Sequence, residues 1–87
     1  MPVKVLIASP LHSYTKAGEV EAEGATVAEV LADLDRRYPG IRFRMVDEQG
    51  RMRRHMRLFV DGEQVFDLRR ALKPGESIHT VQALSGG

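Results

Sequence analysis

The sequence predicts an α+β domain in which a mixed sheet of about five strands packs on one main helix. A single long segment, residues 26–38, has the apolar spacing of an amphipathic helix. Segments on both sides of it are apolar throughout or alternate as strands do. The 87 residues, 43% of them hydrophobic, are enough for one core and too few for two.

The first two strands are expected to lie side by side. Residues 3–8 (VKVLIA) are apolar on both faces, which is typical of a strand inside a sheet. Residues 9–18 are expected to form a loop. Residues 19–24 (EVEAEG) then predict a short, polar edge strand that returns beside the first.

Residues 26–38 carry the clearest signals of a helix. Thr26 and Glu29 match a capping box, in which the threonine hydroxyl accepts from the third helical amide and the glutamate reaches back. Two arginines in the last turn suit the negative end of the helix dipole, and a Pro-Gly pair then ends the helix. The residues expected to face the core are Val27, Val30, Leu31, Leu34 and Tyr38.

The segment after the helix is expected to be irregular before it returns to the sheet. Residues 41–52 show one possible helical turn at 43–46, and residues 54–60 alternate as a strand. Phe43 and Phe59 are expected to lie in the core. The inward positions of the strand are Met56, Leu58 and Val60.

Two turn signals organise the last third of the chain. Asp61-Gly62 predicts a hairpin turn into a short strand at 63–66. Pro74-Gly75 fits the central positions of a type II turn, and residues 77–84 form the last strand. Leu68 and Leu72 are expected to fill the core beneath the intervening loop.

The order is therefore strand, strand, helix, strand, short strand, strand. A hairpin, a helix and further strands require one long crossover, and the helix is the natural cover for one face of the sheet. This arrangement is the β-grasp, or ubiquitin-like, fold. We expect it to span residues 1–84, with 85–87 as a flexible C-terminal Gly-Gly tail.

The C-terminal third also resembles a known family. "LFVDGEQV" followed by "ALKPGESIHTVQALSGG" is similar to the ubiquitin-like sulfur carriers, typified by the small subunit of molybdopterin synthase and the thiamine-pathway sulfur carrier. The helix with its "YPG" ending looks like the same family, and the resemblance runs over essentially the whole chain. The Gly-Gly pair directly after a final strand is its most telling feature.

The resemblance implies a carrier that is not itself an enzyme. An E1-like adenylating enzyme would use ATP to activate the Gly87 carboxylate, and a persulfide or sulfide donor would displace AMP to leave a thiocarboxylate. A biosynthetic enzyme for a cofactor, an amino acid or a tRNA would accept the sulfur. Gly86 and Gly87 suit this chemistry because a Cβ would obstruct a narrow catalytic cleft.

Residues just before the glycines are candidates for partner binding. His79 and Val81 are expected on one face of the last strand, opposite Ile78 and Thr80. Val81 and Leu84 would form a small apolar docking patch if exposed, or an ordinary half-buried strand if not. Leu84 could equally be a last core contact. Ser85 completes the partner-binding set and extends the reach of the acyl end.

Composition excludes several other kinds of site. The chain has no cysteine, which excludes disulfides and a thiol nucleophile, and its three histidines lack metal-ligand spacing. We therefore expect no bound metal or cofactor. The N-terminal apolar run is too short for a membrane span, and a cytoplasmic location without membrane contact is expected.

The sequence leaves two alternatives to a sulfur carrier. A ubiquitin-like protein modifier would use the same first step and end with Gly87 in an isopeptide bond to a lysine. A binding module would use the basic segment Arg51 to Arg57 (RMRRHMR). A net charge of +1 and the acids Asp47 and Glu48 argue against nucleic acid as its ligand. The segment is expected to be a solvated face or a salt-sensitive contact with an acidic partner.

Overall fold

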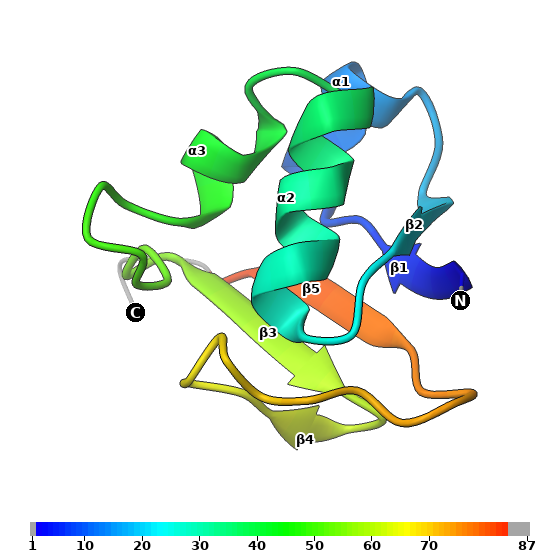
Figure 1. The fold of residues 1–87 in the computed structure, drawn as a ribbon. Helices are drawn as coiled ribbons and strands as arrows, with labels where there is room; N and C mark the ends of the chain where they lie inside the picture. Colours follow the sequence, from blue (N-terminus) through cyan, green and yellow to red (C-terminus); the bar gives the residue numbers. More distant parts are fainter. Residues whose placement is uncertain (1, 84–87) are drawn as a thin grey trace.

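The computed structural model describes residues 2–83 and shows one sheet crossed by one helix (Figure 1). Five strands lie in the order β2-β1-β5-β3-β4. Their bounds are β1 Pro2–Leu6, β2 Glu19–Glu23, β3 Met56–Val60, β4 Glu63–Gln64 and β5 Ile78–Gln82. The expected boundary between 84 and 85 lies outside the described residues.

The sheet is mixed, and β5 lies at its centre. The pairs β1–β2, β3–β5 and β3–β4 are antiparallel, whereas β1 and β5 run parallel. A parallel pair requires a crossover, and the chain between the two strands includes helix α2, which lies over one face of the sheet (Figure 1). The predicted β-grasp arrangement is therefore confirmed.

Helix α2, Val27–Arg37, begins as the sequence predicts. Thr26 Oγ1 accepts a hydrogen bond from Glu29 N at 3.2 Å. Glu29 Oε1 in turn accepts from Ala25 N at 2.9 Å, one residue earlier than in the standard capping box. These two hydrogen bonds give the backbone N–H groups of Glu29 and Ala25 an acceptor, and they fix the start of the helix at Val27.

The core lies between α2 and the inner face of the sheet. Val30, Leu31 and Leu34 are fully buried on the helix, and Val5, Leu58 and Ile78 are fully buried on three adjacent strands. The inward alternation predicted for residues 56, 58 and 60 is confirmed. Tyr38, Leu68 and Leu72 also pack in or against this core, as expected.

The segment expected to be a loop at 9–18 contains helical structure. A 3₁₀ turn, η1, spans Ser9–Leu11, and α1 follows at His12–Thr15. Leu11 and Thr15 are buried on one side, so the segment closes the end of the core beside β1. Their spacing of four residues was present in the sequence, but polar neighbours obscured it.

Helix α3, Ile41–Met45, replaces the predicted turn at 43–46 and overturns one core prediction. Ile41 and Met45 are fully buried, and Phe43 lies between them with 56% of its surface exposed. Residues two positions apart on a helix face different ways, so burying 41 and 45 turns 43 outward. Phe59 is half-buried on the strand face opposite the core, so its placement in the core was also wrong.

Both predicted turns have the backbone they require. Asp61 and Gly62 have φ values of 48° and 86°, which match a hairpin with two left-handed central residues. Gly75 has φ 87°, and Glu76 N donates to Lys73 O at 3.1 Å. These turns fix where β4 and β5 begin.

Candidate functional site

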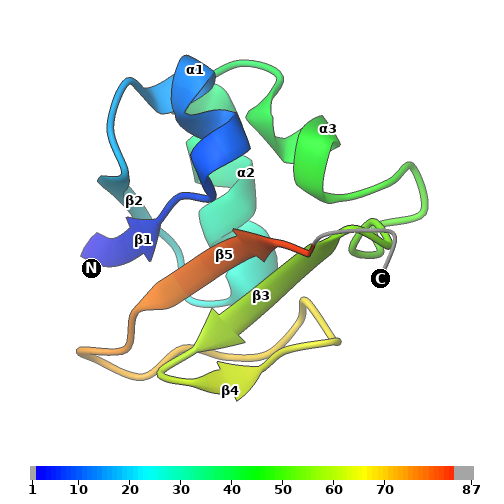
Figure 2. The same ribbon diagram turned by 180° about the vertical axis from the view of Figure 1, so that it is seen from behind.

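Strand β5 places the two partner-binding candidates that the structure describes on its outer side. Ile78 and Thr80 are fully buried towards α2, whereas His79 is exposed and Val81 is half-buried. Figure 2 shows this side of the molecule, with β5 and β3 in front of α2. The predicted alternation is confirmed. Whether His79 and Val81 bind a partner stays a prediction.

Neighbouring strands extend this surface. His79 lies beside Leu6 of β1 on one side and Phe59 of β3 on the other, and Val81 lies opposite Arg57. Leu6, Phe59 and Val81 are each half-buried and lie outside the main core cluster. We call Leu6, Phe59, His79 and Val81 the outer-face strip. It is a small apolar surface with one imidazole at its centre.

The strip includes two residues that the sequence does not single out as site residues. The sequence places Leu6 on the strand face opposite Val3 and Val5, and it places Phe59 in the core. The outward position of Phe59 follows from the inward alternation of its neighbours, so the signal was available. The pairing of Leu6 with His79 depends on a parallel register between residues far apart in the chain, and local spacing does not contain it.

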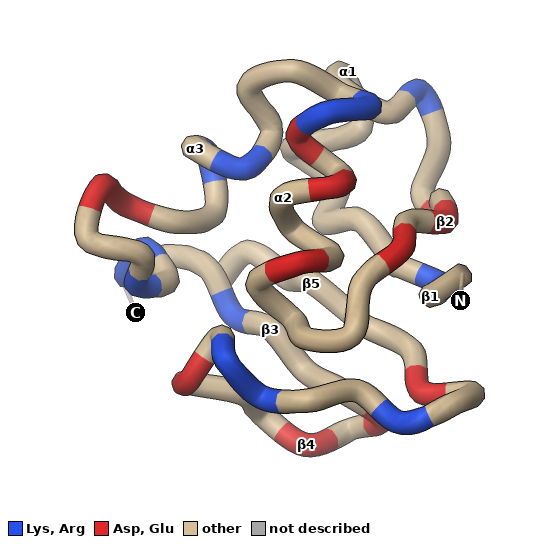
Figure 3. The backbone as a smooth tube through the Cα atoms, in the orientation of Figure 1, with Lys and Arg blue, Asp and Glu red and all other residues tan. Residues whose placement is uncertain are grey.

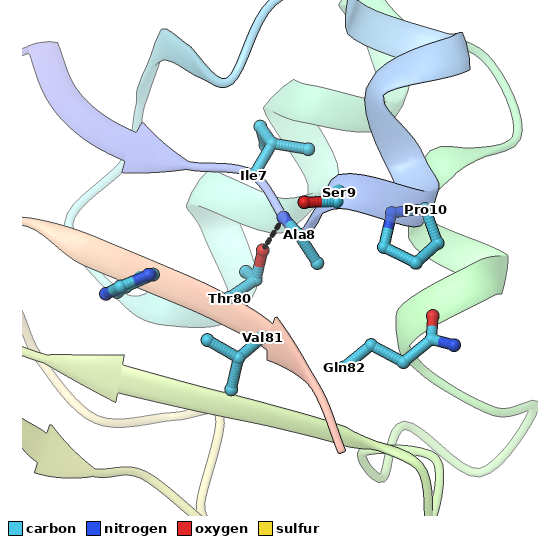
Figure 4. A pocket seen from close by; sticks show the side chains of 8 residues that line it. Ile7, Ala8, Ser9, Pro10, Thr80, Val81 and Gln82 are labelled. Carbon is cyan, nitrogen blue, oxygen red and sulfur yellow. Dashed lines mark hydrogen bonds between the residues drawn. The ribbon is translucent and has the colours of Figure 1, made fainter. Parts of the chain in front are cut away.

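A single hydroxyl links β5 to the end of β1. Thr80 Oγ1 accepts from Ala8 N at 3.0 Å (Figure 4). The same hydroxyl donates to Leu6 O at 3.0 Å. Beyond this point the two strands diverge, because β1 leads into η1. An open hollow of about 370 Å³ lies between them, lined by residues 7–10 and 79–82.

The backbone of β5 is held almost to the end of the described chain. Ala83 N donates to His55 O at 2.7 Å, one step beyond the last ladder pair of Gln82 with Met56. Leu84, Ser85, Gly86 and Gly87, the remaining predicted site residues, lie outside the residues that the structure describes.

The described residues offer little for metal binding or membrane insertion. Among residues 2–83, no group of three or more histidine, aspartate and glutamate side chains could hold a metal ion. His12 Nε2 lies 2.8 Å from the backbone oxygen of Ile7, five positions earlier in the chain. No helix within the same range is long and apolar enough to cross a bilayer.

A charged turn at residues 47–51 leads into the basic segment. Asp47 Oδ1 accepts from Arg51 N at 3.0 Å and from Gln49 N at 2.9 Å. The hydrogen bond from Arg51 N, helped by that from Gln49 N, lowers the pKa of Asp47 below its ordinary value. The charged carboxylate also lies near Arg51, whose Nε is 3.9 Å from Asp47 Oδ2, so it offsets part of the positive charge of the segment that follows.

A mixed sheet with its last strand at the centre and one helix across it defines a β-grasp protein of the ubiquitin-like class. A profile of the ThiS family matches residues 5–87. The sulfur carrier protein CysO of Mycobacterium tuberculosis is 32% identical over an alignment of 93 positions, which covers 100% of both chains. The chain therefore belongs to the ThiS family, a family of ubiquitin-like sulfur carriers, and the resemblance is confirmed.

Solved structures agree with this placement. A chain in the crystal structure of the Amycolatopsis orientalis BexX/CysO complex has a TM-score of 0.88 at 34% identity, covering 98% of this chain and 99% of that one. The crystal structure of M. tuberculosis CysO has a TM-score of 0.88 at 31% identity, covering 94% and 99%.

Proposed function

We propose that this protein carries sulfur as a thiocarboxylate on Gly87. The observation that supports this most directly is its end-to-end similarity to a sulfur carrier, in a chain that has Gly-Gly after its final strand. The protein would be a substrate of an activating enzyme. It needs no cofactor of its own in this scheme, because ATP is bound by the partner.

The chemistry follows from the poor reactivity of a free carboxylate. The Gly87 carboxylate attacks the α-phosphate of ATP in the partner enzyme, pyrophosphate leaves, and an acyl adenylate forms. A sulfide nucleophile then attacks the acyl carbon and AMP leaves, so that one C–O bond is replaced by one C–S bond. A persulfide donor would deliver the same sulfur but needs a further thiol to cleave the resulting S–S bond.

The role of the folded body is to present this end to other proteins. The outer-face strip offers an apolar contact on the strand that leads to Gly86 and Gly87, which is where an enzyme must hold the carrier. Leu84 and Ser85 would enter the cleft with the glycines. The partners are an E1-like adenylating enzyme, a persulfide or sulfide donor, and a sulfur-accepting biosynthetic enzyme.

Intact-mass analysis tests the proposal. The purified protein is incubated with ATP, the activating enzyme from the same organism and sulfide. We expect a mass increase equal to the exchange of one oxygen for one sulfur, located in the C-terminal peptide. The same incubation with a chain lacking Gly87 is the control and should show no change.

Two results would contradict the proposal. One is an unchanged mass with an activating enzyme that is active on another carrier. The other is accumulation of isopeptide-linked C-terminal peptides on cellular lysines without any thiocarboxylate, which would favour the protein-modifier function instead.

A further inference from the structure

The arginines of the chain fall into two groups within the described residues. Five of them form ion pairs with carboxylates: Arg36, Arg37, Arg51, Arg69 and Arg70. Across residues 2–83, the other five form no such pair: Arg42 and Arg44 lie on α3, and Arg53, Arg54 and Arg57 lie within five positions of one another. We call the last three the arginine cluster. Figure 3 shows the arginines of residues 51–57 gathered at the start of β3.

Two members of the arginine cluster are already held in place. Arg53 Nε donates to Phe43 O at 2.7 Å, and its guanidinium lies 4.5 Å from the centroid of the Phe43 ring. Arg57 Nη1 donates to Arg54 O at 2.6 Å and to Met56 O at 3.0 Å. These bonds use only part of the five N–H donors of each guanidinium. Side chains held in this way lose less conformational freedom when they bind an anion.

The cluster borders a hollow with an apolar side. A space of about 520 Å³ is lined by the cluster together with Met52, Val65 and Phe66. Phe66 is 79% exposed, whereas large apolar side chains are usually buried. It lines the same hollow as the three arginines of the cluster. Arginine and aromatic side chains together are typical of protein interfaces. The hollow therefore fits an acidic segment that also carries an apolar side chain.

The position of the cluster relative to Gly87 indicates that an enzyme acting on this end of the chain meets it. Ala83, the last described residue, is bonded to His55 within the same segment. Four residues span at most about 14 Å when fully extended, so the Gly87 acyl carbon can lie no further than that from Ala83. An enzyme that acts on Gly87 must therefore bring its surface close to the arginine cluster.

We infer that the arginine cluster docks onto an acidic segment beside the catalytic cleft of the adenylating enzyme. This inference rests on the proposed function and adds the chemistry of the partner surface. The contact guides association and does not take part in the reaction. Opposite charges at the rim of an interface mainly raise the association rate and make it depend on salt.

ATP–pyrophosphate exchange by the activating enzyme, with the full-length carrier as the varied substrate, tests the inference. The double variant Arg54→Gln/Arg57→Gln should raise the KM for the carrier about tenfold at low salt and leave kcat unchanged. Added NaCl should raise the KM of the unaltered carrier and have less effect on the variant.

Two matched variants separate docking from other effects. Arg36→Gln/Arg69→Gln removes the same charge from ion-paired positions elsewhere and should keep the KM within about twofold of the unaltered protein. Arg54→Lys/Arg57→Lys retains the charge and should recover most of the loss. Thermal unfolding of each variant checks that the fold is intact.

The outcomes are distinguishable. If the unaltered carrier supports exchange and both Gln double variants change the KM equally, or neither does, the inference is overturned and the proposed function stands. If the unaltered carrier supports no exchange, the result contradicts both the proposed function and the inference about the arginine cluster. Binding of a single-stranded RNA oligonucleotide that is lost in Arg54→Gln/Arg57→Gln, with an unchanged KM, would assign the cluster to nucleic acid and overturn the inference.

Discussion

Thr80 joins strands whose register sets the position of the whole C-terminal strand. Its hydroxyl is buried, accepts from Ala8 N and donates to Leu6 O. Only two residue pairs connect β1 and β5 directly, so this side chain extends a short ladder. Thr80 therefore helps to position β5, the strand that leads to Gly86 and Gly87.

Thr80→Val should destabilise the protein by about 1–3 kcal/mol, because it leaves a backbone donor and acceptor at the strand junction without their partner. Thr80→Ser retains the hydroxyl and should lose less. Urea unfolding followed by circular dichroism measures both free energies of unfolding. Equal losses in the two variants would contradict the hydrogen-bonding role and indicate packing by the methyl group.

Val81 is the residue through which the outer-face strip is most simply tested. Val81→Thr preserves size and β-branching and places a hydroxyl in the apolar contact. Burial of that hydroxyl without a partner costs about 1–3 kcal/mol, so the Kd for the activating enzyme should rise at least about fivefold. The free energy of unfolding should change little, because Val81 is half-exposed in the free protein.

Lys4→Thr is the matched control for that measurement. Lys4 also faces outward, on β1, but it lies outside the strip. Titration calorimetry with the activating enzyme should show near-equal affinity for this variant and the unaltered protein. A loss as large as that of Val81→Thr would place the docking surface elsewhere on the sheet.

At the scale of the elements, one carboxylate ties helix α2 to strand β2. Asp33 Oδ2 accepts from Glu23 N at 2.9 Å and from Arg37 Nε at 2.8 Å, and Asp33 also pairs with Arg36. The hydrogen bond from Glu23 N, followed by that from Arg36, lowers the pKa of Asp33 from 3.8 to about 2. The charged form is therefore favoured in the folded protein.

Asp33→Asn should reduce the acid sensitivity of folding. With a lowered pKa, Asp33 stabilises the fold above about pH 4, and this contribution is lost as the pH falls towards 2. The variant should be less stable than the unaltered protein at neutral pH and should show a shallower fall in the free energy of unfolding between pH 4 and 2. Urea unfolding across that range provides the measurement.

Glu19→Gln controls for the loss of one negative charge. Glu19 is exposed on β2, and its removal should leave the acid dependence close to that of the unaltered protein. A flattening as large as that of Asp33→Asn would mean that net charge, not the link between α2 and β2, causes the effect.

At the scale of the whole molecule, stability depends on a core made by one helix and one sheet face. Leu31→Ala should cost about 2–5 kcal/mol, because Leu31 is fully buried and the space it leaves cannot be filled by the rigid sheet. Loss of that size could unfold so small a domain. Leu72→Ala, at the partly exposed margin of the core, should cost less in the same urea experiment.

The success of sequence reasoning varied with how local each signal was. The Thr26 cap, the inward face of α2 and the Asp61-Gly62 turn depend on residues within one or two turns of chain, and all were predicted. The helical segment at His12–Thr15 and the outward side of Phe43 were not predicted. Their conformations depend on which apolar neighbours the rest of the fold supplies.

The sequence by itself determined the β-grasp order of elements, the alternation of β5 and the Gly-Gly end on which the proposed function depends. Tertiary structure alone decided that Leu6 and Phe59 flank His79, and that unpaired arginines gather beside Ala83. The physical reason is that strand register is set by the whole sheet closing over one core. Local periodicity states which way a side chain faces, but not which residue lies beside it.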